Sequence, residues 1–184
     1  MDSTESRVLM DLLQLEREVV ELRYTLSLDA AERVREALRR LGEAGPPHEI
    51  LERSAEELSA STHLEQTLVG RVDAGELAAI SSAGVATPPG VVLGRLEAAA
   101  MSGDAAAVVD VSGHVTARAL GWTECVLAPI RVHGEAAGLL YAAIPPGGRA
   151  LAEFDRALVE RFARGLGIVL EHAVLEHAVE RHRA

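Results

Sequence analysis

Residues 124–144, ECVLAPIRVHGEAAGLLYAAI, contain the pattern that decides the fold. Two apolar runs, 124–132 and 136–144, lie on either side of the turn sequence His133-Gly134-Glu135. Short apolar runs joined by a glycine-containing turn are typical of a β-hairpin. Pro129 cannot donate a hydrogen bond to a neighbouring strand, so the first run is expected to lie at a sheet edge or to contain a bulge. The segment therefore predicts part of an antiparallel sheet.

The strands that would complete this sheet lie upstream of the hairpin. Residues 67–72 and 77–81 are two short strand-like runs joined by a glycine-containing turn, which predicts a second hairpin. Residues 106–111 are apolar and partly β-branched, as expected for a buried strand. A short alanine-rich helix is expected over 93–101, after a Pro-Pro-Gly break. The expected fold class is α+β, an antiparallel sheet flanked by helices.

Three helices are expected before the first strand. The first carries an apolar stripe with heptad spacing. Asp29 and Glu32 have the spacing of a capping box, which predicts the start of a second helix. A pair of prolines then predicts the start of a third. We therefore assign residues 1–45 to an N-terminal helical extension for dimerisation and residues 46–184 to the domain that contains the sheet.

The apolar stripe of the first helix needs a partner. Its members alternate four and three residues apart, which is the spacing of helices that pair with another helix. The pattern favours pairing with a second copy of the chain, and packing against its own domain is the alternative. The stripe consists of Val8, Leu12, Leu15, Val19, Leu22 and Leu26.

A long helix is expected at the C-terminal end, over residues 151–181. Its apolar stripe becomes sparse after Ala173, so the last turns are expected to project from the domain. Gly138, in the predicted sheet, has no side chain and is expected to let this helix or the third N-terminal helix approach closely. Members of the stripe are also assigned to the pairing surface of a homodimer, namely Leu158, Phe162 and Val169.

Three histidines in this helix suggest a metal site at first sight. His172, His177 and His182 are five residues apart, and each interval turns the side chain by about 140° around the helix axis. The three histidines therefore do not share a face of the helix. His172 and Glu176 do face one another, but two ligands are too few for a structural zinc site. We expect an exposed helix surface and no metal.

The composition limits the kinds of partner. The 184 residues carry a formal net charge of −10, and every basic residue is an arginine. Arginines interleaved with glutamates do not fit a nucleic-acid backbone, so no nucleic acid is expected to bind here. A single cysteine, Cys125, and the lack of an apolar run of about 18 residues lead us to expect a cytoplasmic protein without a membrane partner.

The order of these elements resembles that of a GAF domain, and local sequences agree. Residues 125–130 followed by 137–141 are similar to the family's paired strands, with their alanine-proline and glycine-leucine steps. Leu151-x-x-Phe154-Asp155 resembles the opening of its closing helix. Residues 162–175 resemble the N-terminal GAF portion of actinobacterial LuxR-type transcription regulators, which carry a helix-turn-helix downstream. The resemblance covers roughly residues 46–180 and implies a small-molecule pocket on the second sheet face.

Large apolar residues near that second face are the candidate pocket lining, although the same side chains are equally consistent with a packed core. His114 lies in a glycine-flanked loop and could contact a ligand, or bind haem as in some family members; an ordinary loop histidine is the simpler interpretation. Cys125 has no neighbouring base and is expected to be a structural thiol. No cofactor is identified. The candidate lining is Leu93, Leu96, Met101, His114, Trp122, Cys125 and Tyr141.

No nucleophile–base pair, dinucleotide fingerprint or pair of catalytic carboxylates stands out, so catalysis is not expected. The leading hypothesis is the sensory and dimerisation module of a transcription regulator. Its terminal helices would pass the binding of a small-molecule effector or a partner to a DNA-binding domain outside this chain. A stand-alone small-molecule-binding GAF protein and a purely structural dimerisation scaffold are the alternatives.

Overall fold

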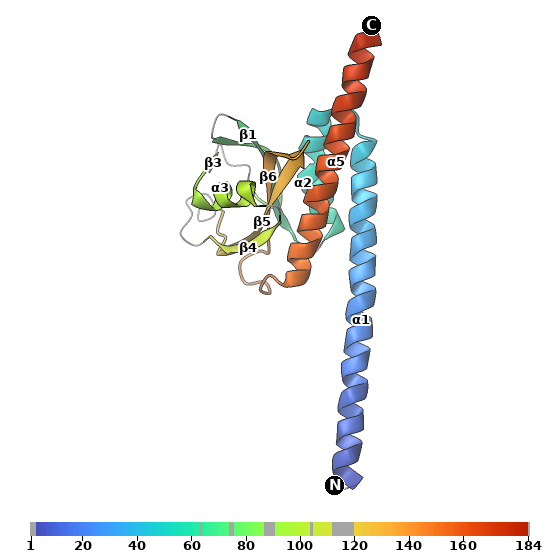
Figure 1. Cartoon of the computed structure of the whole chain (residues 1–184). Helices are drawn as coiled ribbons and strands as arrows, with labels where there is room; N and C mark the ends of the chain where they lie inside the picture. Colours follow the sequence, from blue (N-terminus) through green and yellow to red (C-terminus); the bar gives the residue numbers. More distant parts are fainter. Residues whose placement is uncertain are drawn as a thin grey trace.

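The computed structural model describes residues 3–62, 64–73, 76–86, 91–103, 105–111 and 120–183. A six-stranded sheet is flanked by helices, one of which extends far beyond the domain (Figure 1). The elements in chain order are α1 (Ser3–Gly42), α2 (Pro47–Ser61), β1 (Gln66–Asp73), β2 (Glu76–Ala83), β3 (Val91–Val92), α3 (Arg95–Ser102), β4 (Ala107–Asp110), β5 (Glu124–Val132), β6 (Glu135–Ala143) and α5 (Glu153–Arg183).

The sheet has the strand order β3-β2-β1-β6-β5-β4, and neighbouring strands pair antiparallel. Both predicted hairpins are present, as β1 with β2 and as β5 with β6. The short helix expected over 93–101 is α3, and the long C-terminal helix is α5. The predicted α+β class is therefore confirmed.

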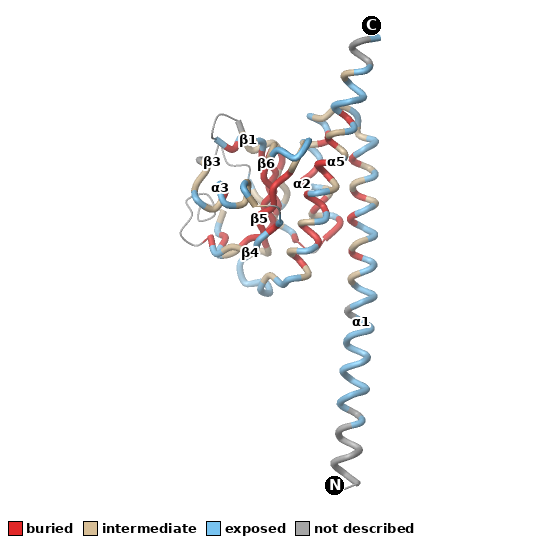
Figure 2. The backbone as a smooth tube through the Cα atoms, viewed as in Figure 1, coloured by how far each residue is buried: buried red, intermediate tan, exposed pale blue. Residues whose placement is uncertain are grey.

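Helices cover the two faces of the sheet unequally. On one face α2 and α5 contact the strands, and α1 packs on both helices. Their shared core contains Val34 from α1, Ile50 from α2 and Phe162 from α5, all fully buried. On the other face α3 contacts β5 and β6. Buried residues accordingly follow the sheet and the inner sides of these helices, while the described residues of α1 between Met10 and Leu22 are exposed (Figure 2).

The structure refines the strand predictions for β5 and for its neighbour β4, which lies at the edge of the sheet. The register of β5 with β6 shifts between Ile130 and Arg131, which confirms the irregularity expected from Pro129. The run at 106–111 does form a strand, β4, but as an edge strand with exposed residues at Ala107 and Asp110. Because β4 pairs with β5 only as far as Leu127, Pro129 faces no β4 residue. The absence of a backbone N–H at Pro129 therefore removes no hydrogen bond between these two strands.

The helix break predicted at Asp29 is wrong. Helix α1 is continuous from Ser3 to Gly42, and both Asp29 and Glu32 are exposed along it. A capping-box spacing also occurs inside helices, where aspartate and glutamate simply face solvent. The residues around Asp29 include alanine and leucine, which favour helix, so nothing interrupts the chain. Only two helices therefore precede the first strand.

Two glycines of α5, and not Gly138, allow the closest helix packing. A Cβ at Gly138 would lie 2.5 Å from the Gly70 carbonyl oxygen of β1, so this glycine serves strand pairing, contrary to the prediction. A Cβ at Gly165 would lie 2.3 Å from Leu38 Cδ1 of α1, and one at Gly167 would lie 2.1 Å from the Arg131 carbonyl oxygen of β5. Helix α5 is thus held against both α1 and the sheet by residues without side chains.

No helix within the described ranges combines the length and the apolarity that crossing a lipid bilayer requires.

Candidate ligand-binding face of the sheet

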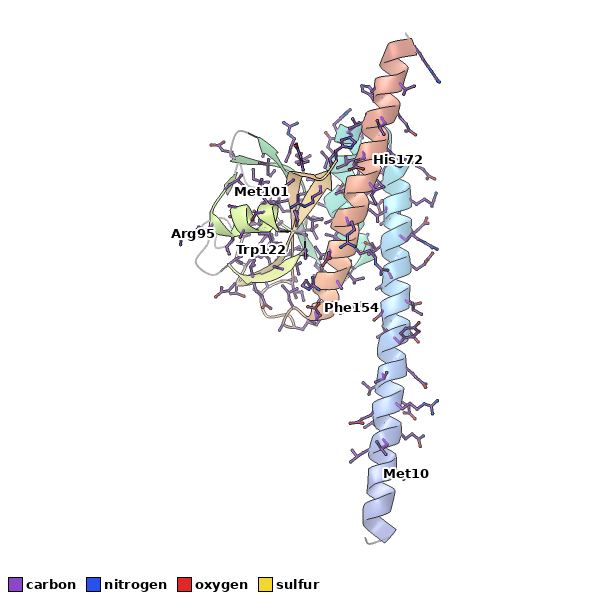
Figure 3. The ribbon with its side chains drawn as sticks, in the orientation of Figure 1. Met10, Arg95, Met101, Trp122, Phe154 and His172 are labelled. Carbon is purple, nitrogen blue, oxygen red and sulfur yellow. The ribbon has the colours of Figure 1, made fainter. Side chains whose placement is uncertain are left out.

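The predicted pocket residues come together on the face that α3 covers. Trp122, Cys125 and Tyr141 are buried there, and Leu93, Leu96 and Met101 pack against them from the α3 side. Met101 and Trp122 lie on the opposite side of the sheet from α5 (Figure 3). His114 falls outside the described residues. The grouping inferred from the sequence is present, and its role in binding a ligand stays a prediction.

Polar atoms of the two large aromatic residues are satisfied within this cluster. The ring centroids of Trp122 and Tyr141 are 6.4 Å apart, with the planes tilted by 32°. Trp122 Nε1 donates a hydrogen bond to Gln66 Oε1 at 2.8 Å, which ties the start of β5 to β1. Tyr141 Oη donates to Glu97 Oε1 at 3.0 Å, which ties β6 to α3. Each aromatic residue therefore joins two elements of the face.

Glu97 is the functional candidate that the sequence analysis missed. Its side chain is only 1% exposed, although glutamate is rarely buried unless it is paired. Besides the Tyr141 hydroxyl, it accepts a hydrogen bond from the Gly94 backbone N–H at 2.9 Å, at the start of α3. Glu97 stands three residues after Gly94, which is the spacing of the glutamate in a capping box. This spacing is the sequence feature from which the hydrogen bond could have been predicted. The cluster therefore contains a carboxylate among apolar groups.

Burial sets the protonation of the two other titratable groups. Burial, together with the nearby negative charges of Glu97 and Glu124, raises the pKa of the Cys125 thiol to about 12. Burial and the adjacent Glu97 carboxylate also raise the pKa of Tyr141 well above its usual value. Both groups keep their protons at neutral pH, so Cys125 is a thiol with little nucleophilic thiolate and Tyr141 is a hydrogen-bond donor.

Arg131 connects this face to the helices on the other side. Its guanidinium donates to the carbonyl oxygens of Met101 at 2.8 Å and Gly103 at 2.7 Å, at the C-terminal end of α3. Its own carbonyl oxygen lies against Gly167 of α5. The adjoining turn is anchored as well, because the His133 backbone N–H donates to the Glu171 carboxylate. One residue of the β5 bulge thus touches α3 with its side chain and α5 with its backbone.

The residues predicted to pair two copies fall into two groups. Leu158 and Phe162 are buried in the core against β5 and α2, and Val169 packs partly buried beside them. The α5 stripe faces its own sheet, so the assignment of Leu158 and Phe162 to a dimer surface is wrong. The α1 stripe is different: its described side chains are 41–61% exposed, while that of Val8 lies outside the description. These are Leu12, Leu15, Val19, Leu22 and Leu26.

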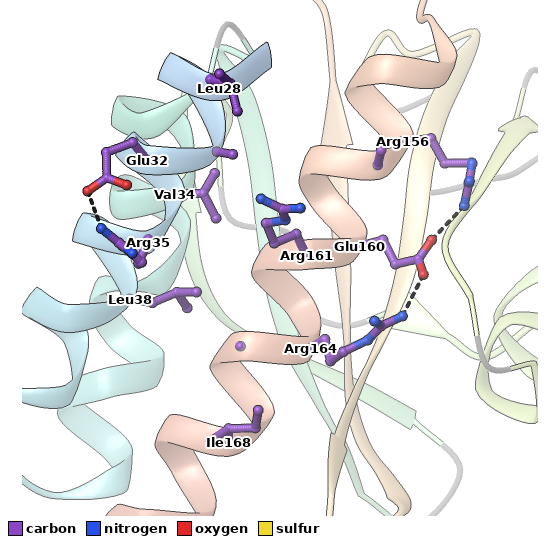
Figure 4. A pocket seen from close by; sticks show the side chains of 13 residues that line it. Leu28, Glu32, Val34, Arg35, Leu38, Arg156, Glu160, Arg161, Arg164 and Ile168 are labelled. Atoms are coloured by element: carbon purple, nitrogen blue, oxygen red, sulfur yellow. Dashed lines mark hydrogen bonds and ion pairs between the residues drawn. The ribbon is translucent and has the colours of Figure 1, made fainter. Parts of the chain in front are cut away.

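A groove between α1 and α5 is a second candidate site (Figure 4). It encloses about 700 Å³, and it brings residues 28–38 beside residues 156–168, which no local sequence pattern could indicate. Glu160 accepts from Arg156 at 2.6 Å and from Arg164 at 2.7 Å, and Arg161 extends into the gap between the helices. Four arginines and two glutamates line it, so its walls carry an excess of positive charge. They are Arg35, Arg156, Arg161, Arg164, Glu32 and Glu160.

The described histidines of α5, His172 and His177, do not form a cluster with other possible metal ligands. His172 and His177 are exposed on the helix surface, and the side chain of His182 lies outside the description. Over the ranges that the structure describes, no three histidine, cysteine, aspartate or glutamate side chains lie close enough together to hold a metal ion.

Comparisons with known proteins agree with this architecture. Among solved structures, a methyl-accepting chemotaxis protein fragment (residues 122 to 287) has a TM-score of 0.63 at 24% identity, over 76% of this chain and 97% of that one. The phycoerythrobilin-bound GAF domain of a cyanobacterial phytochrome gives 0.67 at 16% identity, over 82% and 99%. The GAF domain of a phosphoenolpyruvate-protein phosphotransferase from Coxiella burnetii gives 0.62 at 15% identity, over 83% and 98%.

The search of curated proteins found no match. These three structures are 15–24% identical to the chain, so their likeness shows the fold alone. The sequence itself matches a family model, that of the GAF domain, over residues 46–170, which is most of the chain and covers α2 to the middle of α5. On that match, this chain belongs to the GAF domain family.

Proposed function

We propose that this GAF domain is a non-catalytic sensory module that acts as a homodimer in a transcription regulator. GAF domains are sensory and signalling modules, and they occur in chemotaxis, phosphotransferase and phytochrome proteins. In the proposed scheme a small molecule binds at the α3 face. Helices α1 and α5 then carry the response to a DNA-binding domain in the full-length protein.

The observation that carries this proposal is the position of Arg131. A ligand that moves α3 changes the distance from the Met101 and Gly103 carbonyls to the guanidinium. The Arg131 backbone has no room to move without moving α5, because its carbonyl oxygen already abuts Gly167. Tightly packed elements of this kind respond to a local change by shifting together. The two faces of the sheet are therefore mechanically connected at this residue.

The C-terminal part of α5 fits the role of a connector. The helix continues for ten residues beyond Ala173, the last of its described side chains to be buried. Val174, Leu175 and Val179 are 42–56% exposed there. Exposed apolar residues at the end of a rigid helix suit packing against a following domain or a second helix. The net charge of −10 places DNA contacts outside this segment.

Native mass spectrometry of the purified chain tests the sensory part. We expect an additional non-covalent mass that is lost on denaturation, and weaker retention of that mass in Trp122→Ala. The matched control is Tyr24→Ala, which removes an exposed aromatic side chain of α1 that lines neither candidate site. Equal retention in both variants would contradict binding at the α3 face. The role in a transcription regulator is tested by the gene sequence, which should encode a helix-turn-helix in the same reading frame.

A structural dimerisation scaffold is the second candidate function, because the exposed stripe of α1 requires a partner whether or not a ligand binds. Light scattering tests the dimer that both functions share. We expect a dimer at micromolar concentration and a shift towards monomer in Leu15→Glu/Leu22→Glu, with Gln14→Glu as the control on the polar side of the same helix. A monomeric wild-type chain would contradict both proposals. A stable dimer without ligand would favour the scaffold.

A further inference from the structure

A separate pocket lies on the helix-covered face of the sheet, on the side opposite to α3. It encloses about 220 Å³ where the start of α2, the sheet and α5 meet (Figure 1). Its walls include Leu51 of α2, Ile130 of β5 and Leu170 of α5, which belong to the core beneath the helices or pack against it. None of its described lining residues belongs to the α3 cluster of Trp122 and Tyr141.

The pocket exists because the sheet lacks a side chain at its floor. Side chains of a strand alternate between the two faces, and Leu140 and Ala142 of β6 belong to the core beneath the helices. Gly138 therefore lies on that same face. A Cβ at Gly138 would lie 2.5 Å from the Gly70 carbonyl oxygen, so the pairing of β6 with β1 excludes any larger residue. Strand pairing thus keeps a space open beneath α2 and α5.

The lining is apolar in its depth and charged at its opening. Among the ten described residues that line the pocket, Arg71 alone carries a charge. Ile130, Gly138 and Leu170 are buried, whereas Arg71 and Val174 are exposed and therefore mark the opening. An apolar interior with a guanidinium at its opening complements an apolar molecule that has one negatively charged end.

The volume sets the size of this molecule. A cavity of about 150 Å³ holds benzene, so the present pocket accommodates roughly six to eight carbon atoms. A guanidinium has five N–H donors, so Arg71 can bind a carboxylate while it keeps another hydrogen bond. A medium-chain carboxylate therefore matches both the volume and the charge.

We propose that this pocket binds a medium-chain carboxylate, with the alkyl chain between α2 and α5 and the carboxylate at Arg71. Leu170 and Val174 stand one turn apart on α5, and they line the pocket where this helix leaves the domain. A ligand there contacts the outgoing helix directly, whereas a ligand on the α3 face acts through Arg131. The pocket is thus a second input to the same helix, and it holds whether or not the α3 face binds a ligand.

Isothermal titration calorimetry of the full chain with octanoate tests the site. We expect saturable binding of one octanoate per chain and about tenfold weaker binding in Val174→Phe, because the larger ring occupies the opening of the pocket. Leu175→Phe adds the same ring at the next residue of α5, which is exposed and does not line the pocket, and should bind octanoate as the wild type does. Val132→Phe narrows the pocket from β5 and provides a second variant should Val174→Phe fold poorly.

A charge-removing variant tests the position of the carboxylate. Arg71→Met keeps a long side chain without the charge and should weaken octanoate binding by about two- to fivefold, the effect of an exposed ion pair. Octanol, which has no charge, should bind Arg71→Met and the wild type equally. Arg17→Met removes an exposed arginine of α1 and should change neither affinity. Equal weakening of octanoate and octanol in Arg71→Met would contradict the contact between Arg71 and the carboxylate.

The remaining outcomes separate this pocket from other sites on the chain. Weaker octanoate binding in Val174→Phe and not in Leu175→Phe supports the pocket. Undiminished binding in Val174→Phe together with loss in Trp122→Ala places octanoate on the α3 face, which overturns the inference and favours the proposed sensory site. Equal binding by all variants indicates adsorption to the exposed apolar residues of α1 and overturns the inference, as does a wild-type chain that binds no octanoate.

Discussion

At the scale of single residues, Glu97 is the most informative group on the candidate ligand face. A buried carboxylate is tolerated only when hydrogen-bond donors compensate for lost water, and here the Tyr141 hydroxyl and the Gly94 N–H do so. An incoming ligand with its own donor could replace the Tyr141 hydroxyl. The same pair can therefore stabilise the empty domain and recognise a polar group.

Removing the Tyr141 hydroxyl tests this pairing. We expect Tyr141→Phe to lower the free energy of unfolding by about 1–3 kcal/mol, because it leaves the buried Glu97 carboxylate short of a donor. Urea unfolding of the full chain measures the change. Tyr24→Phe removes a hydroxyl from an exposed residue and should leave the stability within about 0.5 kcal/mol. Equal effects of the two substitutions would contradict a role of the Tyr141–Glu97 hydrogen bond.

At the scale of elements, α5 is positioned by its glycines. Glycine inside a helix normally costs about 1 kcal/mol relative to alanine, so two of them within three residues need a reason. Close contact with Leu38 on α1 and with Arg131 on β5 supplies it. The sequence alone does not reveal this role, since it does not show which backbone or side chain lies opposite each glycine.

Alanine substitutions at these two glycines should differ in effect. Gly167→Ala places a methyl group against the rigid Arg131 backbone and should destabilise the domain by about 1–3 kcal/mol, against the usual gain in helix propensity. Gly165→Ala meets the end of the Leu38 side chain, which can rotate, and should cost less. Thermal unfolding of both variants measures the order. A Gly167→Ala variant more stable than the wild type would contradict the close approach of α5 to β5.

At the scale of the whole molecule, the question is how the α3 face communicates with the terminal helices. Arg131 contributes hydrogen bonds to the last carbonyls of α3, which have no partners within the helix. The neighbouring turn reaches α5 through Glu171. Residues at the β5 bulge therefore connect the candidate ligand face to the helix that leads out of the domain.

Hydrogen exchange of an Arg131 variant tests this connection. We expect Arg131→Met to accelerate amide exchange in α3 by several-fold, because the end of the helix loses two charge-assisted hydrogen bonds. Arg95→Met, at the exposed start of α3, removes an equal charge and should leave the exchange rates unchanged. Unaltered α3 exchange in Arg131→Met would show that Arg131 does not hold the helix. Faster exchange that extends into α5 would support coupling across the sheet.

The sequence by itself determined the elements whose pattern is local. Apolar runs around short turns specified both hairpins. Cys125 and Tyr141 were expected to lie together because they belong to paired strands, and Trp122 lies just before the first of these strands. The apolar stripe of α1 was also visible, since heptad spacing depends only on neighbours within two turns.

Only the tertiary structure decided which surfaces are covered. It removed the break at Asp29, assigned Phe162 to the core and revealed the buried Glu97, because each depends on what packs opposite and not on adjacent residues. One row of apolar residues on α1, spaced at intervals of four from Leu22 to Val34, shows this most directly. Leu26 and Ala30 stand on the same row, and the position of the domain alone makes one a surface residue and the other part of the core.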